Sequence, residues 1–127
     1  MINVVGGIIR KNHRFLICRR GPKEPMPGFW EFPGGKVECG ETEKESLRRE
    51  LKEELDIDSK IGSLISNYTY NYLDKSFNLF FYDIDSFKGK IKQRVHDKII
   101  WEKMENFKKY EFLPGDIPLI NKMLSLF

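Results

Sequence analysis

The sequence of 127 residues predicts an α/β protein, because β-rich runs alternate along it with two amphipathic helices. The first observation is the segment 43–55, which has no Gly, Pro or β-branched residue and consists mainly of strong helix formers. The second is a pair of β-rich runs, 61–72 and 76–84, which is typical of two long strands. The third is an apolar helix face near the C-terminus, formed by Leu119, Ile120, Met123, Leu124 and Phe127.

The other strands are expected on both sides of these elements. Near the N-terminus, the β-rich runs 3–10 and 15–20 flank a polar turn at 11–14, which predicts a hairpin. The Pro/Gly-rich loop 21–28 follows, and stiff loops on a rigid scaffold often shape binding sites. A further short strand is expected at 99–101.

The helix predicted over 43–55 has clear start signals. Thr42 can cap its N-terminus, and Glu45 three residues later completes the capping-box pattern. A repeat of every fourth residue gives it an apolar stripe, which consists of Leu47, Leu51 and Leu55. The stripe predicts that one face of this helix packs against the sheet.

A second face of the same helix is acidic, because Glu50, Glu53 and Glu54 fall at positions i, i+3 and i+4. Like charges at this spacing cost a few tenths of a kcal/mol per pair. A Mg²⁺ ion would offset this repulsion, since it prefers carboxylate oxygens and keeps waters and substrate phosphates in its other positions. The alternative is a solvated acidic face, which is common in Glu-rich helices.

The spacing around the helix favours the metal site. Gly35 is followed after five residues by Glu41, after seven more by the run 49–51, and then by Glu53, Glu54 and Ile57. This spacing resembles the signature box of the Nudix hydrolases. Asp56 departs from it, because the family usually has Gly after the helix, where a left-handed backbone is common. Asp tolerates that conformation less well than Gly.

The resemblance extends over nearly the whole chain to the MutT-like proteins, which remove damaged nucleotides from the pool. It implies a single domain over 1–127, with the box at 35–57. The implied fold is a Nudix-type α/β/α sandwich, in which a mixed, curved β-sheet lies between the two helices. The chain is expected to act in the cytoplasm, as a monomer or a homodimer, on a nucleotide.

The activity that the resemblance implies is Mg²⁺-dependent hydrolysis of a nucleoside triphosphate, normal or oxidised, to the monophosphate and pyrophosphate. Mn²⁺ is the alternative ion. Two other functions stay open. One is hydrolysis of another Nudix substrate, such as a dinucleoside polyphosphate, ADP-ribose or a capped RNA. The other is a catalytically silent nucleotide-binding domain.

The resemblance also implies roles for individual residues. The metal ligands would be Glu50, Glu53, Glu54 and the carbonyl group of Gly34. Glu53 would be the general base, and Arg49 would orient the glutamates. The substrate-binding residues would be Arg20, Glu31, Phe32, Gly35, Tyr72 and Asp116. Tyr72 is the weakest of these, because aromatic stripes along strands are more often part of a core. Arg19 would face away from Arg20 and form a surface ion pair.

Asp116 has two interpretations. It fits a helix N-cap, with Pro118 in the first turn. The matching position in MutT-like proteins contacts the base. Since a carboxylate only accepts hydrogen bonds, Asp116 favours a cytosine-type or other amino-bearing base.

One expected carboxylate is missing. MutT-like enzymes often have an acidic residue six positions before the equivalent of Trp101, where this chain has Val95. The neighbouring His96 and Asp97 are the candidates to replace it. If neither does, the glutamates of the box must both bind the metal and supply the general base.

Composition bears on three further features: a nucleic-acid partner, a membrane span and a disulfide. The net charge of +3, without a dense Lys/Arg run, argues against a stable nucleic-acid partner. No apolar run approaches the length of a membrane span. Cys18 and Cys39 lie in very different contexts, so we expect free thiols rather than a disulfide.

Overall fold

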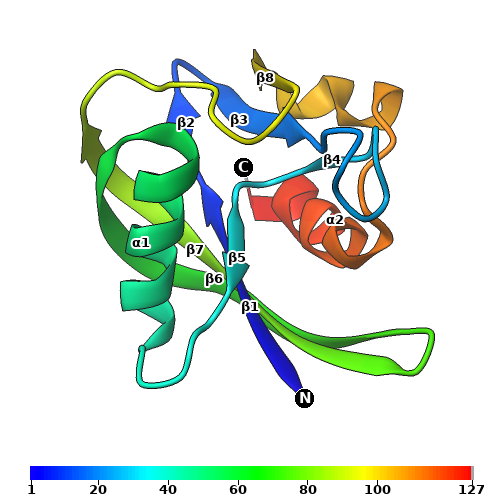
Figure 1. Ribbon diagram of the computed structural model, residues 1–127. Coiled ribbons are helices and arrows are strands. Elements are labelled where there is room, and N and C mark those ends of the chain that lie inside the picture. Colours follow the sequence, from blue (N-terminus) through cyan, green and yellow to red (C-terminus); the bar gives the residue numbers. More distant parts are fainter. Residues whose placement is uncertain (127) are drawn as a thin grey trace.

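The computed structural model describes residues 1–126 (Figure 1). The strands are β1 (Ile2–Ile8), β2 (Arg10–Lys11), β3 (Arg14–Arg19), β4 (Trp30–Glu31), β5 (Gly34–Lys36), β6 (Asp58–Tyr72), β7 (Lys75–Lys88) and β8 (Lys98–Glu102). The helices are α1 (Glu43–Leu55) and α2 (Ile117–Leu126), with two short 3₁₀ helices at Met104–Lys109 and Pro114–Asp116. Phe127, which was expected on the apolar face of α2, lies outside the described residues.

The strands of residues 1–126 form two sheets. The first is mixed and has the order β5-β1-β7-β6, in which β1 runs parallel to β7 and the other neighbours are antiparallel. Its register shifts at three places between Lys60 and Ser66, and such irregularities bend a sheet. In the second sheet, β2, β4 and β8 all pair antiparallel with β3. The predicted α/β class and mixed sheet are confirmed, and the second sheet is an addition.

The hairpin predicted near the N-terminus forms only at its turn. The short strand β2 pairs with β3, whereas β1 belongs to the other sheet and pairs with β5 and β7. The chain changes sheets at Ile9, whose carbonyl group still accepts a hydrogen bond from the Leu16 N–H (3.0 Å). The prediction of one long strand was therefore wrong, because strand propensity depends on the neighbours that a strand finds.

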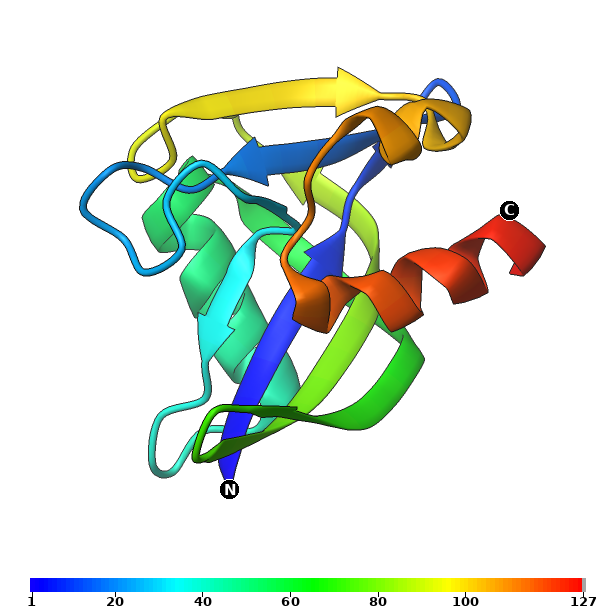
Figure 2. The ribbon, with the colours of Figure 1, turned by 90° about the vertical axis from the view of Figure 1, so that its right-hand side faces the viewer.

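The mixed sheet lies between the two helices, as expected for an α/β/α sandwich (Figures 1 and 2). Helix α1 packs against Val5 of β1 and Ile84 of β7. Its contacts come from the predicted stripe, the fully buried Leu47, Leu51 and Leu55. Each buried leucine stabilises the fold by about 2 kcal/mol. On the other side, Leu119 and Met123 of α2 pack in a cluster with Phe81.

The two ends of α1 have the conformations that the sequence predicts. The Thr42 hydroxyl accepts a hydrogen bond from the Glu45 N–H (3.1 Å), and the Thr42 N–H donates to the Glu45 carboxylate (2.9 Å), which confirms the capping box. Asp56 has the left-handed conformation that the family usually gives to Gly, with φ 57°. Three cations contact its carboxylate, Lys52, Lys92 and Arg94. They lower the pKa of Asp56, chiefly through the hydrogen bond from Lys52.

Two expectations from composition can be compared with the described residues. Both cysteines are free thiols, as predicted, with Cys18 buried and Cys39 exposed. Within residues 1–126, neither helix combines the length and the apolar character that crossing a membrane requires.

Candidate active site

Arg49, on α1, is the hub of the acidic cluster. Its guanidinium group holds Glu41 in a fork, with Nε donating to Oε2 (2.7 Å) and Nη2 to Oε1 (3.0 Å). The same group donates through Nη1 to Glu50 (2.9 Å) and to Glu53 (3.2 Å). The hydrogen bond from Arg49 is the main reason why the pKa of Glu41 falls to about 2. Arg49 thus fixes the side chains around it, as a planar donor with several N–H groups can.

Glu50 and Glu54 lie against the two glycines that begin β5. The Gly34 N–H donates to Glu54 Oε1 (3.3 Å). A Cβ atom on Gly35 would lie 2.5 Å from the Glu50 carboxyl group, so only Gly leaves room for it. Burial raises the pKa of Glu54 to about 9, and the charges of Glu31 and Glu50 add to the shift.

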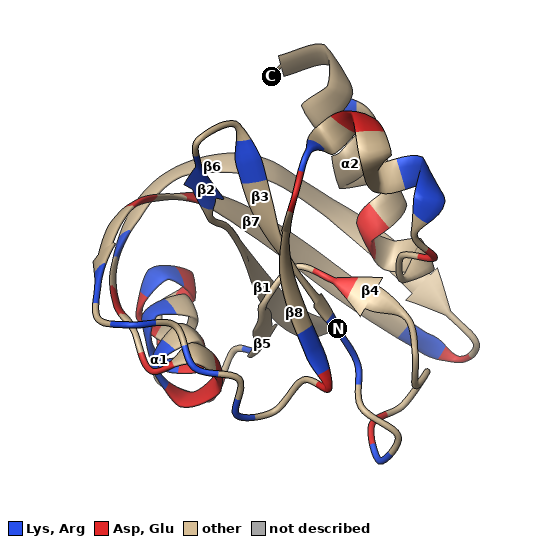
Figure 3. Cartoon of the chain, turned by 90° about the horizontal axis from the view of Figure 1, so that it is seen from above, with Lys and Arg blue, Asp and Glu red and all other residues tan. Residues whose placement is uncertain are grey.

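Glu53 is the most open of the three glutamates, with 58% of its side chain exposed, against 15% for Glu50. In residues 1–126 as they stand, no three His, Cys, Asp or Glu side chains converge closely enough to hold a metal ion. The oxygen donors that Mg²⁺ prefers are nevertheless gathered on one face of α1. Figure 3, coloured by charge, shows the acidic and basic segments along α1 and the acidic segment of β4.

The acidic segment of β4 is Glu31, and it joins Arg20 to the cluster. Arg20 Nη1 donates to Glu31 Oε1 (2.8 Å), while Arg20 Nε donates to the carbonyl group of Pro25 in the Pro/Gly-rich loop (2.6 Å). The neighbouring Arg19 points elsewhere and forms an ion pair with Asp97 (2.8 Å). Adjacent residues of a strand face opposite sides, so this division agrees with the sequence.

Asp116 lies next to β4 in space. It is buried, and its Oδ2 accepts a hydrogen bond from the Phe32 N–H (3.2 Å). Burial, with a smaller contribution from the charge of Glu31, raises the pKa of Asp116 to about 8. The N-cap role predicted for Asp116 does not appear among its hydrogen bonds. In the first turn of α2 the Leu119 N–H donates instead to the Tyr68 hydroxyl (3.3 Å).

One extended segment, residues 30–36, therefore connects two buried carboxyl groups. Asp116 holds it through the N–H of Phe32, and Glu54 holds it through the N–H of Gly34. Glu31 lies between these two contacts, and its charge raises the pKa of both carboxyl groups. The segment 30–36 thus connects the acidic cluster on α1 to the 3₁₀ helix Pro114–Asp116, which together with Leu113 is called the Asp116 loop below.

The family model described as NUDIX domain matches residues 2–123. The chain belongs to the Nudix hydrolase family. It is 32% identical over 126 residues to the CTP pyrophosphohydrolase of Escherichia coli (strain K12), with 99% of this chain and 93% of that protein covered. It is 31% identical over 126 residues to the 8-oxo-dGTP diphosphatase of the same organism, with 98% of both covered. The solved structure of the E. coli ORF135 protein superposes with a TM-score of 0.90 and 32% identity, covering 99% of this chain and 90% of that one.

One predicted residue of this Nudix hydrolase lies apart from the others. Tyr72 is at the tip of the β6–β7 hairpin, pairs with Lys75 and is 40% exposed. Earlier on the same strand, Tyr68 donates its hydroxyl to the carbonyl group of Gly115 (2.6 Å), next to Asp116. Tyr68 thus contacts the residue next to Asp116, and the substrate-binding role of Tyr72 stays a prediction.

The two candidates to replace the carboxylate missing at Val95, His96 and Asp97, lie in different environments. Val95 is exposed and Asp97 is paired with Arg19, whereas His96 is buried and its Nε2 lies 3.0 Å from Glu31 Oε2. Sequence reasoning did not foresee the burial of His96. The polar stretch around it gives no sign that one residue turns inward.

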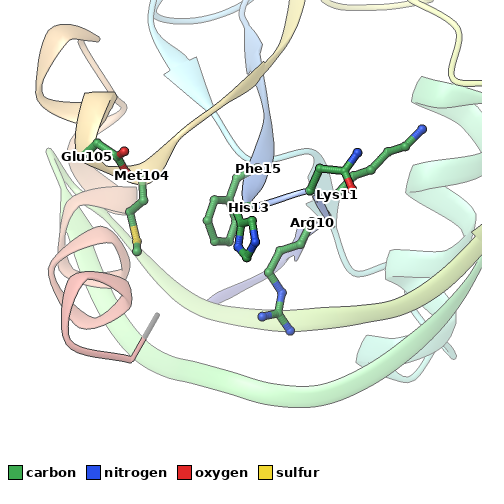
Figure 4. A pocket seen from close by; sticks show the side chains of 7 residues that line it. Arg10, Lys11, His13, Phe15, Met104 and Glu105 are labelled. Carbon is green, nitrogen blue, oxygen red and sulfur yellow. The ribbon is translucent and has the colours of Figure 1, made fainter.

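Two hollows on the surface of the Nudix hydrolase lie away from the site. The first, of about 500 Å³, is lined by Arg10, Lys11, Asn12, His13, Phe15, Met104 and Glu105 (Figure 4). The second, of about 550 Å³, lies beside α1 and is lined by residues including Arg48, Asp58 and Ser59. Neither hollow includes a residue predicted to bind metal or substrate.

Proposed function

We propose that this Nudix hydrolase cleaves nucleoside triphosphates, including oxidised or otherwise modified ones, to the nucleoside monophosphate and pyrophosphate. The observation that supports it is the segment 30–36, which links the acidic face of α1 to the Asp116 loop. A nucleotide has the same two ends, a polyphosphate chain and a base. The names of the two E. coli relatives, which refer to CTP and to 8-oxo-dGTP, agree with this substrate class.

The donor set fits a divalent cation. Burial and, after it, the negative charges of Glu31 and Glu50 raise the pKa of Glu54 to about 9. A nearby cation reverses such a shift, because it favours the ionised carboxylate. We propose that Glu50, Glu53, Glu54 and the Gly34 carbonyl group hold Mg²⁺, or Mn²⁺ in its place. Such an ion neutralises phosphate charge and lowers the pKa of a bound water.

The residues of the chain do the rest of the chemistry. Glu53 is the proposed general base, because it is the most open of the three glutamates and can reach a water in the site. Arg49 keeps Glu50 and Glu53 in place through its Nη1 hydrogen bonds. Arg20 is proposed to bind phosphate oxygens or the base, as guanidinium groups do.

The base is proposed to lie near Phe32 and Asp116. The structure changes one premise here. Burial raises the pKa of Asp116 to about 8, so this group has a protonated form that donates a hydrogen bond as well as an ionised form that only accepts. The preference for a cytosine-type or other amino-bearing base therefore stays a prediction, and the relative named for CTP agrees with it. Cytosine and guanine nucleotides, oxidised and normal, are the substrates to compare.

The test is a panel of nucleotides with the change Glu53→Gln. With Mg²⁺, the wild type should release pyrophosphate from at least one of CTP, dCTP, GTP and 8-oxo-dGTP. Glu53→Gln should lower kcat roughly 10²- to 10⁴-fold, as loss of a general base does. Glu105→Gln, an equal change at an exposed residue outside the site, should keep the wild-type rate.

Three results would contradict the proposed activity, and a fourth would contradict the proposed role of Glu53. Release of orthophosphate without pyrophosphate would place the cleaved bond elsewhere. Turnover of ADP-ribose, a dinucleoside polyphosphate or capped RNA alone would identify another Nudix substrate. Binding of nucleotides without turnover would identify a silent domain. An unchanged rate for Glu53→Gln would remove Glu53 from the mechanism.

A further inference from the structure

The segment before β8 sends three neighbouring side chains in three directions. Val95 is 47% exposed, and Asp97 forms its ion pair with Arg19 at the surface. His96 turns inward, and only 3% of its side chain is exposed. Of these three, His96 alone contacts a residue of the proposed site, and that residue is Glu31.

The contact between His96 and Glu31 has a defined direction. Glu31 uses one oxygen for each neighbour, Oε1 for Arg20 (2.8 Å) and Oε2 for His96 Nε2 (3.0 Å). On the other side of the ring, Nδ1 is buried and has no hydrogen-bond partner within the described residues. A buried N–H without a partner is rarer in proteins than an acceptor without one. The proton of the neutral ring therefore belongs on Nε2, where it is donated to Glu31.

We propose that His96 is a positioning residue for Glu31. It fixes the second oxygen of the Glu31 carboxylate and so sets how Glu31 and Arg20 face the nucleotide. Glu31 also influences Glu54 and Asp116 at the two ends of the site, so its position matters to both. His96 itself touches neither the reacting atoms nor the metal ligands. This inference rests on the proposed function, in which Arg20 and Glu31 bind the nucleotide.

The position of the proton on the His96 ring can be tested by NMR, without an assay of enzyme activity. The chain has two histidines, so His13→Gln leaves His96 as the source of the imidazole signals. Long-range ¹H–¹⁵N NMR of that variant should show Nε2 protonated and Nδ1 bare, and adding Glu31→Ala should shift the Nε2 signal. A proton on Nδ1, or an Nε2 signal that Glu31→Ala leaves unchanged, would overturn the inference.

The positioning role is tested by a double-mutant cycle. The readout is the Kd of a non-hydrolysable α,β-methylene nucleotide with Mg²⁺, together with kcat and KM for the best substrate. His96→Leu should weaken binding about tenfold, the scale of one lost hydrogen bond to a charged group, and change kcat less than twofold. His96→Gln should restore most of the affinity, because its amide N–H can reach where Nε2 lies. Asp97→Asn, next in the chain but at the surface, should bind like the wild type.

The cycle distinguishes positioning from a general effect on folding. In a Glu31→Ala background, His96→Leu should change Kd less than twofold, because its target is gone. A loss as large as in the wild-type background would overturn the proposal. If His96→Leu does not fold, His96→Met, which also lacks a donor for Glu31, replaces it in both backgrounds, and equal losses would overturn the proposal in the same way. A wild type that binds no nucleotide would refute the proposed function, while the NMR result would still decide the His96–Glu31 contact.

Discussion

Changing Gly35 to Ala should separate activity from stability. The new Cβ atom would lie 2.5 Å from Cδ and Oε2 of Glu50. These atoms are the far end of a flexible side chain, so Glu50 can move aside without disturbing the backbone. The move would take its carboxylate away from Arg49, which holds it at 2.9 Å. The fold should survive, and the proposed metal site should not.

Two quantities should change in Gly35→Ala, the free energy of unfolding and the rate of hydrolysis. Replacing Gly by Ala in a strand favours folding by roughly 0.5–1 kcal/mol through the unfolded chain. Moving Glu50 offsets part of this, so the free energy of unfolding should change by less than about 1 kcal/mol. The rate should fall roughly 10²- to 10³-fold, the scale for loss of one group that stabilises a transition state.

Gly34→Ala is the matched contrast. Its Cβ atom would lie 1.9 Å from the carbonyl oxygen of Val5, which is backbone of the neighbouring strand β1 and cannot rotate away. We expect a destabilisation of at least about 3 kcal/mol, the upper end of overpacking effects. Urea or thermal unfolding measures both variants, with a shift in Tm of roughly 3–5 °C per kcal/mol for a domain of this size. Pyrophosphate release measures the rate.

Two results would refute this reasoning. If Gly35→Ala kept the wild-type rate, the position of Glu50 would not matter to the chemistry. If Gly35→Ala unfolded as readily as Gly34→Ala, the contact with Glu50 would not be soft.

Three further predictions concern Arg49, Asp116 and the N-cap residue Thr42. Arg49→Lys removes the fork on Glu41, so kcat should fall roughly 10- to 100-fold while the protein stays folded, as kinetics and circular dichroism would show. Asp116 has a folded-state pKa of about 8 against roughly 3.9 when unfolded, so its contribution to stability is present in acid and is lost as the pH rises from about 4 to about 8. The Tm of the wild type should therefore fall more across this window than that of Asp116→Asn, and parallel profiles would contradict the shift. Thr42→Ala should cost about 1 kcal/mol of stability through the lost capping box, with kcat unchanged.

Local parts of the protein were predictable from the sequence. The bounds, capping box and buried leucine stripe of α1 depend on residues within one helix, and the spacing of the box predicted the family. The long β6–β7 hairpin and the short strand β8 also follow from local patterns. These features could be predicted because each depends on neighbours a few positions apart, where helix and strand periods apply.

The parts that escaped prediction are contacts between distant segments. Phe32 and Asp116 are 84 positions apart, and Glu31 and His96 are 65 apart. No local period relates such residues, and neither the burial of Asp116 nor the rise in its pKa that follows from burial could be read from the sequence. The hydrogen bond from the Tyr68 hydroxyl to the Gly115 carbonyl group also joins distant segments and could not be predicted from the strand pattern.

The sequence by itself determined that a row of carboxylates follows a Gly-Gly pair and lies on one face of a capped helix. Only the tertiary structure decided which side chains from the rest of the chain complete that face. The physical reason is that burial and the approach of like charges change the pKa of a carboxyl group, and both depend on how the sheets bring β4, the segment before β8 and the Asp116 loop together.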